Sequence, residues 1–196
     1  MMSKKKQILE TAKELFWKYG IKRVTVEEIC NRASVSKMTF YKYFSNKNDL
    51  VKHILDNLYS ESMQKYRKIM SSEREYKDKV SDLYKLKLEA TNAISHEFLS
   101  DFYNSGDEEL MGYLNKKVAE NISLMIQDFI DAQDKGEIRK DMKPEFINFI
   151  LNHIVELGND PKLNSLYPNA QEMILELTNF FFYGILPRTE NNENEE

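Results

Sequence analysis

The sequence predicts an all-α protein with a small N-terminal helical domain followed by a larger helical body. Glycine and proline, which weaken helices, are scarce, at 6 and 4 of 196 residues. Apolar residues recur at intervals of three and four along most of the chain, which is the spacing of one helix face. The balance of charge also changes sign along the chain, and this separates an N-terminal segment from the rest.

The two segments carry opposite net charges. The first 53 residues hold 12 Lys and Arg against 5 Asp and Glu, whereas the remainder holds 16 against 27, for a net charge of −4. A basic segment on an acidic chain indicates that the first part meets a polyanion and that the second does not. Chance clustering of solvated charges is the alternative interpretation.

Simple counts argue against several protein classes. Cys30 is the single cysteine, so an intramolecular disulfide is impossible and a reducing compartment is expected. No apolar run approaches the ~20 residues of a membrane helix. The basic start of the chain becomes amphipathic at once, unlike the apolar core of a signal peptide. We therefore expect a cytoplasmic protein without a membrane partner.

The first two helices are predicted from apolar spacing and capping residues. Residues 3–19 carry one apolar stripe that begins at Ile8, and Gly20 ends the helix because glycine adopts the left-handed conformation at little cost. Thr25, followed three residues later by Glu28, forms a capping box at the start of the second helix. Cys30 lies on the inner face of this helix, as a small buried hydrophobe.

A third short helix follows, and its outer face is unusually polar. Ser34 and Val35 are predicted to form a tight turn, and Ser36 to cap a helix over residues 37–44. Phe40 and Phe44, one helical turn apart, can pin it against the first two helices. Two short helices joined by such a turn form a helix-turn-helix, whose second helix enters the major groove of DNA. Seven residues span roughly 10 Å, which fits a groove about 12 Å wide.

The outer face of this third helix carries groups that suit DNA. Lys37 can reach guanine O6 and N7 or a phosphate, Thr39 a thymine methyl group or a phosphate, and Tyr41 and Tyr43 can donate to phosphate oxygens. Lys47 lies in the first turn of the next helix, where Ser45 or Asn46 can cap, and the helix N-terminus favours an anion there. The alternative is that these are ordinary solvated positions.

The segment ILETAKELFWKYGIKRVTVEEICNRASVSKMTFYKYFSNKNDLV resembles the N-terminal domain of TetR-family transcriptional regulators over about residues 5–55. The resemblance rests on four motifs: the first helix ending in Phe-x-x-x-Gly, the Thr before the second helix, VSKMTFYKYF, and the Lys that opens the fourth helix. Ser34 departs from the family's frequent Gly, and Met38 from its usual small residue or Pro. The predicted DNA-binding set is Thr25, Ser36, Lys37, Met38, Thr39, Tyr41, Lys42, Tyr43 and Lys47.

The remaining chain is predicted to be a helical body over residues 47–187, following a helix-turn-helix domain over residues 1–46. Helices are expected over residues 46–70, 75–94, around 96–103, from a cap at Asp107 to 135, from Pro144 to about 157, and over 169–185. The acidic segment 188–196 lacks apolar residues and is expected to be disordered. The consecutive acids at 107–109 fit a solvated first helical turn better than a metal site.

The last two long helices are apolar nearly all round, which predicts that a partner subunit covers one side of them. A pair of central helices within a monomer is the alternative. In the TetR family, the corresponding helices form a four-helix bundle in a homodimer. The predicted interface residues are Phe146, Ile150, Ile154, Leu157, Met173, Leu177, Phe180 and Phe181.

The family resemblance also implies that the earlier body helices enclose a cavity for a small-molecule effector, whose identity the sequence does not give. Several aromatic residues and methionines lie on helix faces that could line it, although such residues are more often plain core. The predicted pocket residues are Tyr84, Phe98, Phe102, Tyr113, Met125 and Phe129.

No catalytic or metal-binding pattern is visible. The three histidines are far apart and lack a partner at ligand spacing, and no nucleophile or phosphate-loop motif is present. We expect no cofactor and no enzymatic activity. The predicted function is a ligand-responsive, dimeric transcriptional regulator, and a repressor, that binds double-stranded DNA at a palindromic operator. The alternatives are an architectural DNA-binding protein without an effector and an enzyme with an appended DNA-binding module.

Overall fold

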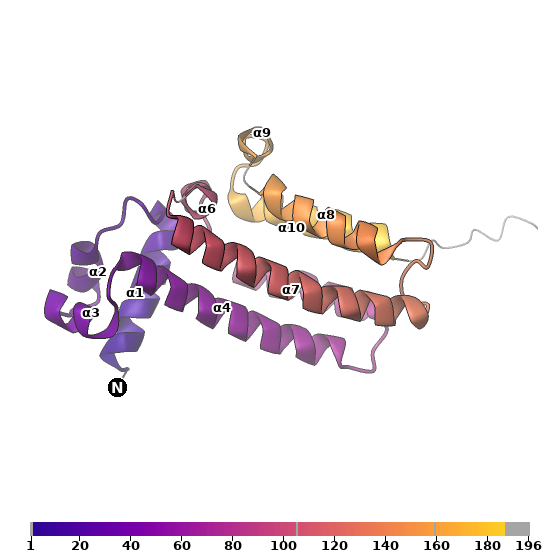
Figure 1. Cartoon of the computed structure of the whole chain (residues 1–196), viewed down its shortest axis with the longest axis horizontal. Coiled ribbons are helices and arrows are strands. Elements are labelled where there is room, and N and C mark those ends of the chain that lie inside the picture. Colours follow the sequence, from indigo (N-terminus) through magenta and orange to yellow (C-terminus); the bar gives the residue numbers. More distant parts are fainter. Residues whose placement is uncertain (1, 105, 159, 187–196) are drawn as a thin grey trace, which may run out of the picture.

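The protein is all-α in the residues that the computed structural model describes, which are 2–104, 106–158 and 160–186 (Figure 1). The all-α prediction is therefore confirmed. Three short helices form a head at one end of the molecule: α1 (Lys4–Tyr19), α2 (Val26–Arg32) and α3 (Lys37–Tyr43). The body contains α4 (Lys47–Met70), α5 (Tyr76–Ala90), α6 (His96–Tyr103), α7 (Glu108–Asp134), α8 (Pro144–Leu157), α9 (Pro161–Asn164) and α10 (Ala170–Ile185).

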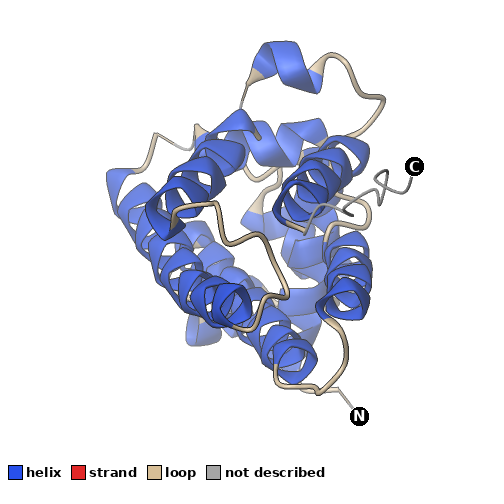
Figure 2. Cartoon of the chain, turned by 90° about the vertical axis from the view of Figure 1, so that its right-hand side faces the viewer, coloured by secondary structure: helices blue, strands red, loops and turns tan. Residues whose placement is uncertain are grey.

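The long helices α4 and α7 lie side by side and set the length of the body (Figure 1). Seen from the end opposite the head, the body helices cluster together with α9 standing outside them (Figure 2). Because α4 begins at the head and runs without a break to Met70, it joins the head to the far end of the body. A movement of the body can therefore reach the head along one continuous helix.

Polar side chains fix where the helices begin. Thr25, Ser36, Asn46 and Asp107 each accept a hydrogen bond from the backbone N–H three residues later, which satisfies a donor that the helix start leaves open. The predicted caps at Thr25, Ser36 and Asp107 are confirmed. At the start of α4, Asn46 rather than Ser45 is the cap.

Two elements differ from the sequence prediction. Helix α5 ends at Ala90, not at residue 94, because the chain turns at residues 91–93 and Ala93 adopts a left-handed φ of 64°. The short helix α9 was not predicted. Its cap, Asp160, accepts from the N–H groups of Lys162 and Leu163, and Pro161 begins the turn.

The buried side chains form two clusters. One lies under the head and the adjoining part of the body and contains Phe16, Phe40 and Leu50. The other lies in the far half of the body and contains Tyr66, Phe129 and Phe182. The described residues contain no helix long and apolar enough to cross a membrane. The predicted tail over residues 188–196 lies outside the described residues.

Two residues of the predicted dimer interface belong to this chain's own core. Met173 is fully buried in the cluster under the head, and Phe181 is buried in the far cluster, where its ring lies 5.5 Å from that of Phe129. Helix α10 carries apolar side chains on nearly every side, so the sequence pattern could not tell which side faces the chain's own core. Met173 and Phe181 thus pack in this chain's own core, and the dimer interface itself stays a prediction.

Candidate nucleic-acid interface

Helices α2 and α3 are joined by a tight turn that orients the second helix. Ser34 has a left-handed φ of 52°, in the place where the sequence departs from a glycine. The N–H of Val35 donates to the carbonyl of Cys30 at 3.0 Å, and Ser36 Oγ then accepts from the N–H of Thr39 at 3.1 Å. The turn thus ends one helix and starts the next within four residues.

Helix α3 is attached to the head by its aromatic inner face. Phe40 and Phe44 are fully buried and their rings lie 5.7 Å apart. On the opposite face, Met38 is 83% exposed and Tyr41 is 56% exposed, and Lys42 is also exposed. An outward face with a large exposed methionine and tyrosine has no packing role within the described chain, which favours contact with another molecule.

The other predicted DNA-binding residues on the head are partly engaged. Thr39 and Tyr43 are half-buried at the edges of the exposed face. The Thr25 and Ser36 hydroxyls cap their helices, and Ser36 Oγ also lies 2.9 Å from Thr39 Oγ1. Thr25 and Ser36 therefore lie at helix starts, where exposed backbone N–H groups can also meet a phosphate.

Lys37 is paired in the free protein. Its Nζ donates to Glu27 Oε2 on α2 at 2.8 Å, and both side chains are largely exposed. The hydrogen bond and the charge of Lys37 lower the pKa of Glu27, and Glu27 in turn raises the pKa of Lys37. Because the pair is exposed, water screens it, and a DNA base or phosphate can replace Glu27 as the partner.

Lys47 has a structural role that the sequence did not indicate. Its Nζ donates to the carbonyl oxygens of Ile21, Lys22 and Val24 at 2.8, 3.2 and 3.0 Å. These three acceptors match the three N–H donors of an ammonium group. Burial lowers the pKa of Lys47. The side chain thus holds the loop between α1 and α2 against α4, and its predicted phosphate contact remains a prediction.

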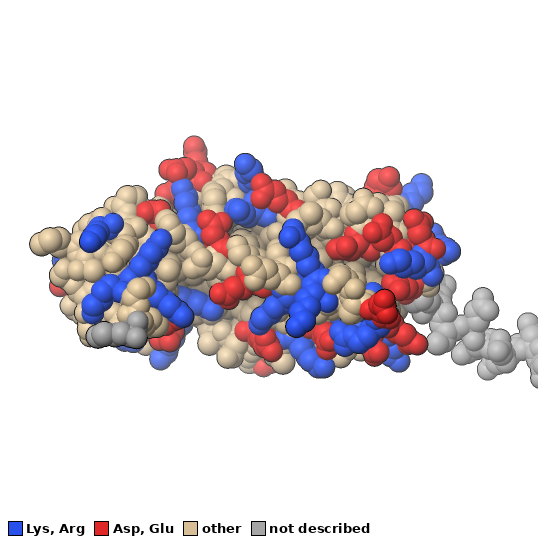
Figure 3. All heavy atoms as spheres, turned by 90° about the horizontal axis from the view of Figure 1, so that it is seen from below, with Lys and Arg blue, Asp and Glu red and all other residues tan. Residues whose placement is uncertain are grey.

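Basic side chains at the start of α1 add to the candidate interface. Lys4 Nζ lies 3.4 Å from the carbonyl of Ser34 in the turn, and Lys5 lies over the ring of Phe44. Figure 3 shows Lys and Arg side chains gathered over the end of the molecule that carries the head, while both signs mix over the body. The consecutive lysines at positions 4–6 were the available sequence signal for this addition.

The head and the body meet through α6. The N–H of Ser95 donates to the carbonyl of Trp17 at 2.9 Å, and the Trp17 ring lies 4.3 Å from Phe98. The N–H of Lys22 donates to Asp101 Oδ2 at 2.7 Å. A Cβ at Gly20 would lie only 2.5 Å from the Asp101 carboxylate, so the close contact requires glycine there. The loop between α1 and α2 is therefore held by both α4 and α6.

The predicted dimer residues lie partly on an exposed apolar face of α8 and α10. Phe146, Leu157 and Phe180 are exposed, at 51%, 40% and 76%. Ile150, Ile154 and Leu177 are half-buried. Sequence reasoning missed two exposed residues of these helices, Phe149 and Tyr183, at 56% and 69%. We call Phe146, Phe149, Leu157, Phe180 and Tyr183 the apolar face.

The six predicted pocket residues are divided between the two buried clusters. Phe98, Phe102 and Tyr113 pack in or against the cluster under the head, whereas Met125 and Phe129 belong with the far cluster, and Tyr84 is half-buried on α5. Phe98 and Phe129 are buried core residues of their clusters, and the effector pocket itself stays a prediction. Within the described residues, no group of three or more His, Cys, Asp and Glu could hold a metal ion.

Residues 8–54 match the family of bacterial regulatory proteins described as tetR family. The chain is 40% identical over 53 residues to the HTH-type transcriptional regulator TtgR of Pseudomonas putida, covering 27% of this chain and 25% of that protein. The Bacillus subtilis regulator YuxN is 32% identical over 99 residues, which are 48% of this chain and 34% of that protein. The matched segments are therefore a quarter to a third of the length of these relatives.

Solved structures resemble the chain over almost its whole length. The fatty acid degradation regulator FadR of Bacillus halodurans has a TM-score of 0.72 at 17% identity, with 94% of this chain and 97% of that chain covered. A TetR/AcrR-family regulator of Thermobifida fusca has 0.62 at 20% identity, covering 92% and 97%. A regulator of Saccharomonospora viridis in complex with choline has 0.71 at 17% identity, covering 94% and 98%. At these identities the likeness establishes the fold.

Proposed function

We propose that this protein is a ligand-responsive transcriptional regulator, because residues 8–54 match the tetR family and the described chain resembles regulators of the TetR/AcrR family in fold. It binds double-stranded DNA as a homodimer and acts as a repressor. The observation that carries the proposal is the outward face of α3, where Met38 and Tyr41 stand exposed on a helix anchored by Phe40 and Phe44. This face lies on the basic end of an otherwise acidic chain.

On DNA, α3 lies in the major groove and its outward side chains meet base edges. Lys37 exchanges Glu27 for guanine or phosphate, Tyr41 and Lys42 reach the backbone, and Met38 offers an apolar contact to a thymine methyl group. Lys4 and Lys5 approach the flanking phosphates. Two observations support these contacts: the side chains are exposed on α3, and the head matches a family of regulatory proteins. Helix α3 is also short enough to fit the major groove.

Dimer formation is supported by the apolar face of α8 and α10. Five large side chains exposed on two neighbouring helices would be costly to leave in water, and a second copy of the same face covers them symmetrically. Two heads related by a two-fold axis require a palindromic operator, with half-sites about one DNA turn or a multiple of it apart.

A small molecule bound in the body acts by changing the separation of the two heads. Both heads must fit one duplex at once, so a shift of a few ångströms removes most of the specific affinity. Helices α4 and α6 are the two elements that hold the loop between α1 and α2, through Lys47 and Asp101. These contacts supply a physical route from body to head.

The proposal is tested by selecting bound duplexes from a random pool with the full chain, then measuring affinity at fixed salt. We expect one palindromic sequence to be enriched and to bind about 10³-fold or more tightly than random DNA. Similar affinity for every duplex would instead identify an architectural DNA-binding protein and would contradict the proposal. A Tyr41→Ala variant that remains folded should lose DNA binding, which would attribute the binding to the outward face of α3.

A further inference from the structure

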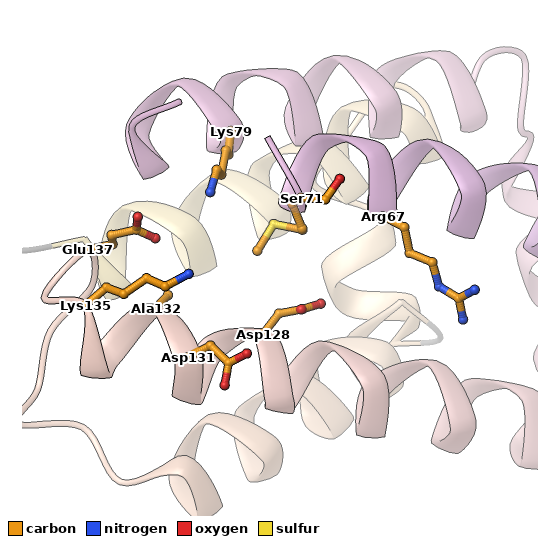
Figure 4. Close-up of a pocket in the computed structure, with 9 residues that line it drawn as sticks. Arg67, Ser71, Lys79, Asp128, Asp131, Ala132, Lys135 and Glu137 are labelled. Carbon is orange, nitrogen blue, oxygen red and sulfur yellow. The ribbon is translucent and has the colours of Figure 1, made fainter. Parts of the chain in front are cut away.

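A polar cavity of ≈ 330 Å³ lies in the far half of the body, between α4, α5 and α7. Figure 4 shows the side chains around it: Arg67 comes from the end of α4, Lys79 from α5, Asp128 and Asp131 from α7, and Lys135 and Glu137 from the chain just after α7. The volume lies at the small end of the range for ligand sites, which suits a molecule about the size of an amino acid.

The charges around this cavity are balanced but unpaired. Three cationic and three anionic side chains line it, and none of the six forms an ion pair with another described residue. Elsewhere in the described chain, ion pairs between exposed side chains are frequent. Of the six, Lys79 is buried, whereas Arg67, Asp131 and Lys135 are exposed at the rim.

Lys79 is the unusual member of the set. Its side chain is only 5% exposed, and no hydrogen bond or ion pair of its ammonium group is made with the described residues. Figure 4 shows the side chain extending from α5 into the space toward α7. Because no described residue supplies an anionic partner for this ammonium group, an anion bound in the cavity would form an ion pair with it directly.

Two buried tyrosine hydroxyls lie beside the acidic wall of the same cavity. Tyr66 and Tyr76 are 6% and 3% exposed, and the Tyr76 hydroxyl has no hydrogen-bond partner among the described residues. Burial, followed by a hydrogen bond to Asp128 and by its charge, raises the pKa of Tyr66, and burial followed by the charge of Asp128 raises the pKa of Tyr76. Asp128 itself forms no ion pair with a described residue, so its carboxylate can accept the cationic group of a ligand.

We propose that this cavity binds a small zwitterion of amino-acid size, with its carboxylate at Lys79 and its ammonium group at Asp128. An apolar ligand would bury both charges without compensating either. A simple anion would compensate Lys79 but strip water from Asp128, and a simple cation would do the reverse. A zwitterion compensates both ends and leaves the balanced charge of the site unchanged.

This inference deepens the proposed function, since it names the effector class, and it rests on that function only for the response of DNA binding. The cavity touches Arg67 in the last turns of α4, and Lys47 at the other end of that helix holds the head. Occupancy that shifts the end of α4 is therefore communicated to the loop between α1 and α2.

The test uses the full chain and twenty probes, the free L-amino acids, added singly in thermal unfolding and calorimetric titration. At least one should raise the unfolding midpoint by roughly 5–10 °C at a hundredfold excess over its Kd. Its N-acetyl derivative, which lacks the cation, and its methyl ester, which lacks the anion, should each bind at least tenfold more weakly. Failure of all twenty, or equal binding of either derivative, overturns the proposal.

Two variants locate the site. Lys79→Gln and Asp128→Asn should each weaken binding of the same amino acid at least tenfold, whereas Lys77→Gln, an exposed position on α5, should leave it unchanged. Cooperative unfolding of the unliganded variants shows that they are folded. Wild-type affinity in either folded variant places the ligand elsewhere and overturns the assignment.

A DNA-binding assay separates this inference from the proposed function. The amino acid that binds should lower operator affinity at least tenfold in wild type and leave it unchanged in Asp128→Asn. Binding of the zwitterion without any change in DNA affinity overturns its role as effector. Absence of specific DNA binding with intact zwitterion binding instead contradicts the proposed function and leaves the cavity assignment standing.

Discussion

Lys37 points away from the core, but in the free protein its ammonium group is held by Glu27 at 2.8 Å. The same carboxylate that keeps this side chain ordered also competes with DNA for it. Because both partners are exposed, the competition is weak and screened by salt. Glu27 thus sets how readily the Lys37 ammonium group becomes available to DNA. The sequence did not suggest this role, because Glu27 and Lys37 lie ten residues apart.

Substitution of Lys37 by Ala should relax the preference for one base pair in each half-site by about tenfold to a hundredfold, if Lys37 contacts guanine. Glu27→Gln is the matched variant, because it removes the competing anion and should tighten binding to all duplexes. Competition binding with single-base operator variants measures both. Equal losses on operator and random DNA would show that Lys37 touches only the backbone.

Lys47→Met should lower the free energy of unfolding by about 1–3 kcal/mol, because three carbonyl oxygens lose a charged donor. Urea unfolding measures the loss, provided that the slope of the free energy against urea concentration is unchanged. Lys42→Met, at an exposed position on α3, is the control. If Lys47 also contacts a phosphate, the salt dependence of DNA binding falls by about one unit. Unchanged stability would contradict the structural role.

At the residue scale, the sequence predicts local contacts well and distant ones poorly. The caps at Thr25, Ser36 and Asp107 follow from a bond between residues three apart, so they can be read from spacing alone. The partners of Lys47 are backbone carbonyls more than twenty residues earlier. A carbonyl has no signature in a sequence, and only the packed head brings these groups together.

At the scale of elements, α8 and α10 each carry exposed apolar residues and buried apolar residues. The sequence indicated that both helices are apolar nearly all round, but periodicity cannot separate core from interface when every side is apolar. The structure makes this division: Met173 and Phe181 face inward, whereas Phe180 and Tyr183 face outward. The predicted pocket residues raise the same difficulty, because aromatic residues occur both in cores and in cavity walls, and the pocket stays a prediction.

Phe180→Glu should convert the protein from dimer to monomer at micromolar concentration, because it places a charge on the apolar face at its most exposed residue. Sedimentation velocity measures the mass in solution. Met38→Glu, equally exposed but on α3, is the control and should remain dimeric. A dimeric Phe180→Glu variant, or a monomeric wild type, would contradict the assignment of this face.

At the scale of the whole molecule, the head is attached to the body at two places, α4 and α6. Lys47 holds the loop from one side, and Asp101 accepts from the N–H of Lys22 on the other. Gly20 permits the close approach of α6. The fold class and the head could be predicted from the sequence, but this junction joins segments some eighty residues apart and has no local pattern.

Asp101→Ala should loosen the junction without unfolding the body. Loss of a hydrogen bond to a charged acceptor is worth about 1.5–3 kcal/mol, so amide exchange in residues 20–24 should become roughly tenfold to a hundredfold faster. Exchange in α10 should remain unchanged, which serves as the internal control. Equal acceleration in both regions would show global destabilisation, and no acceleration would show that Asp101 does not hold the loop.

The central claim is that the outward face of α3 lies in the major groove of DNA. Dimethyl sulfate footprinting of the selected operator tests it most directly, since the reagent reports guanine N7 in the major groove and adenine N3 in the minor groove. We predict protection of guanine N7 in two symmetric half-sites. Protection confined to adenine N3, or no protection of guanine N7 in the bound operator, would contradict the claim.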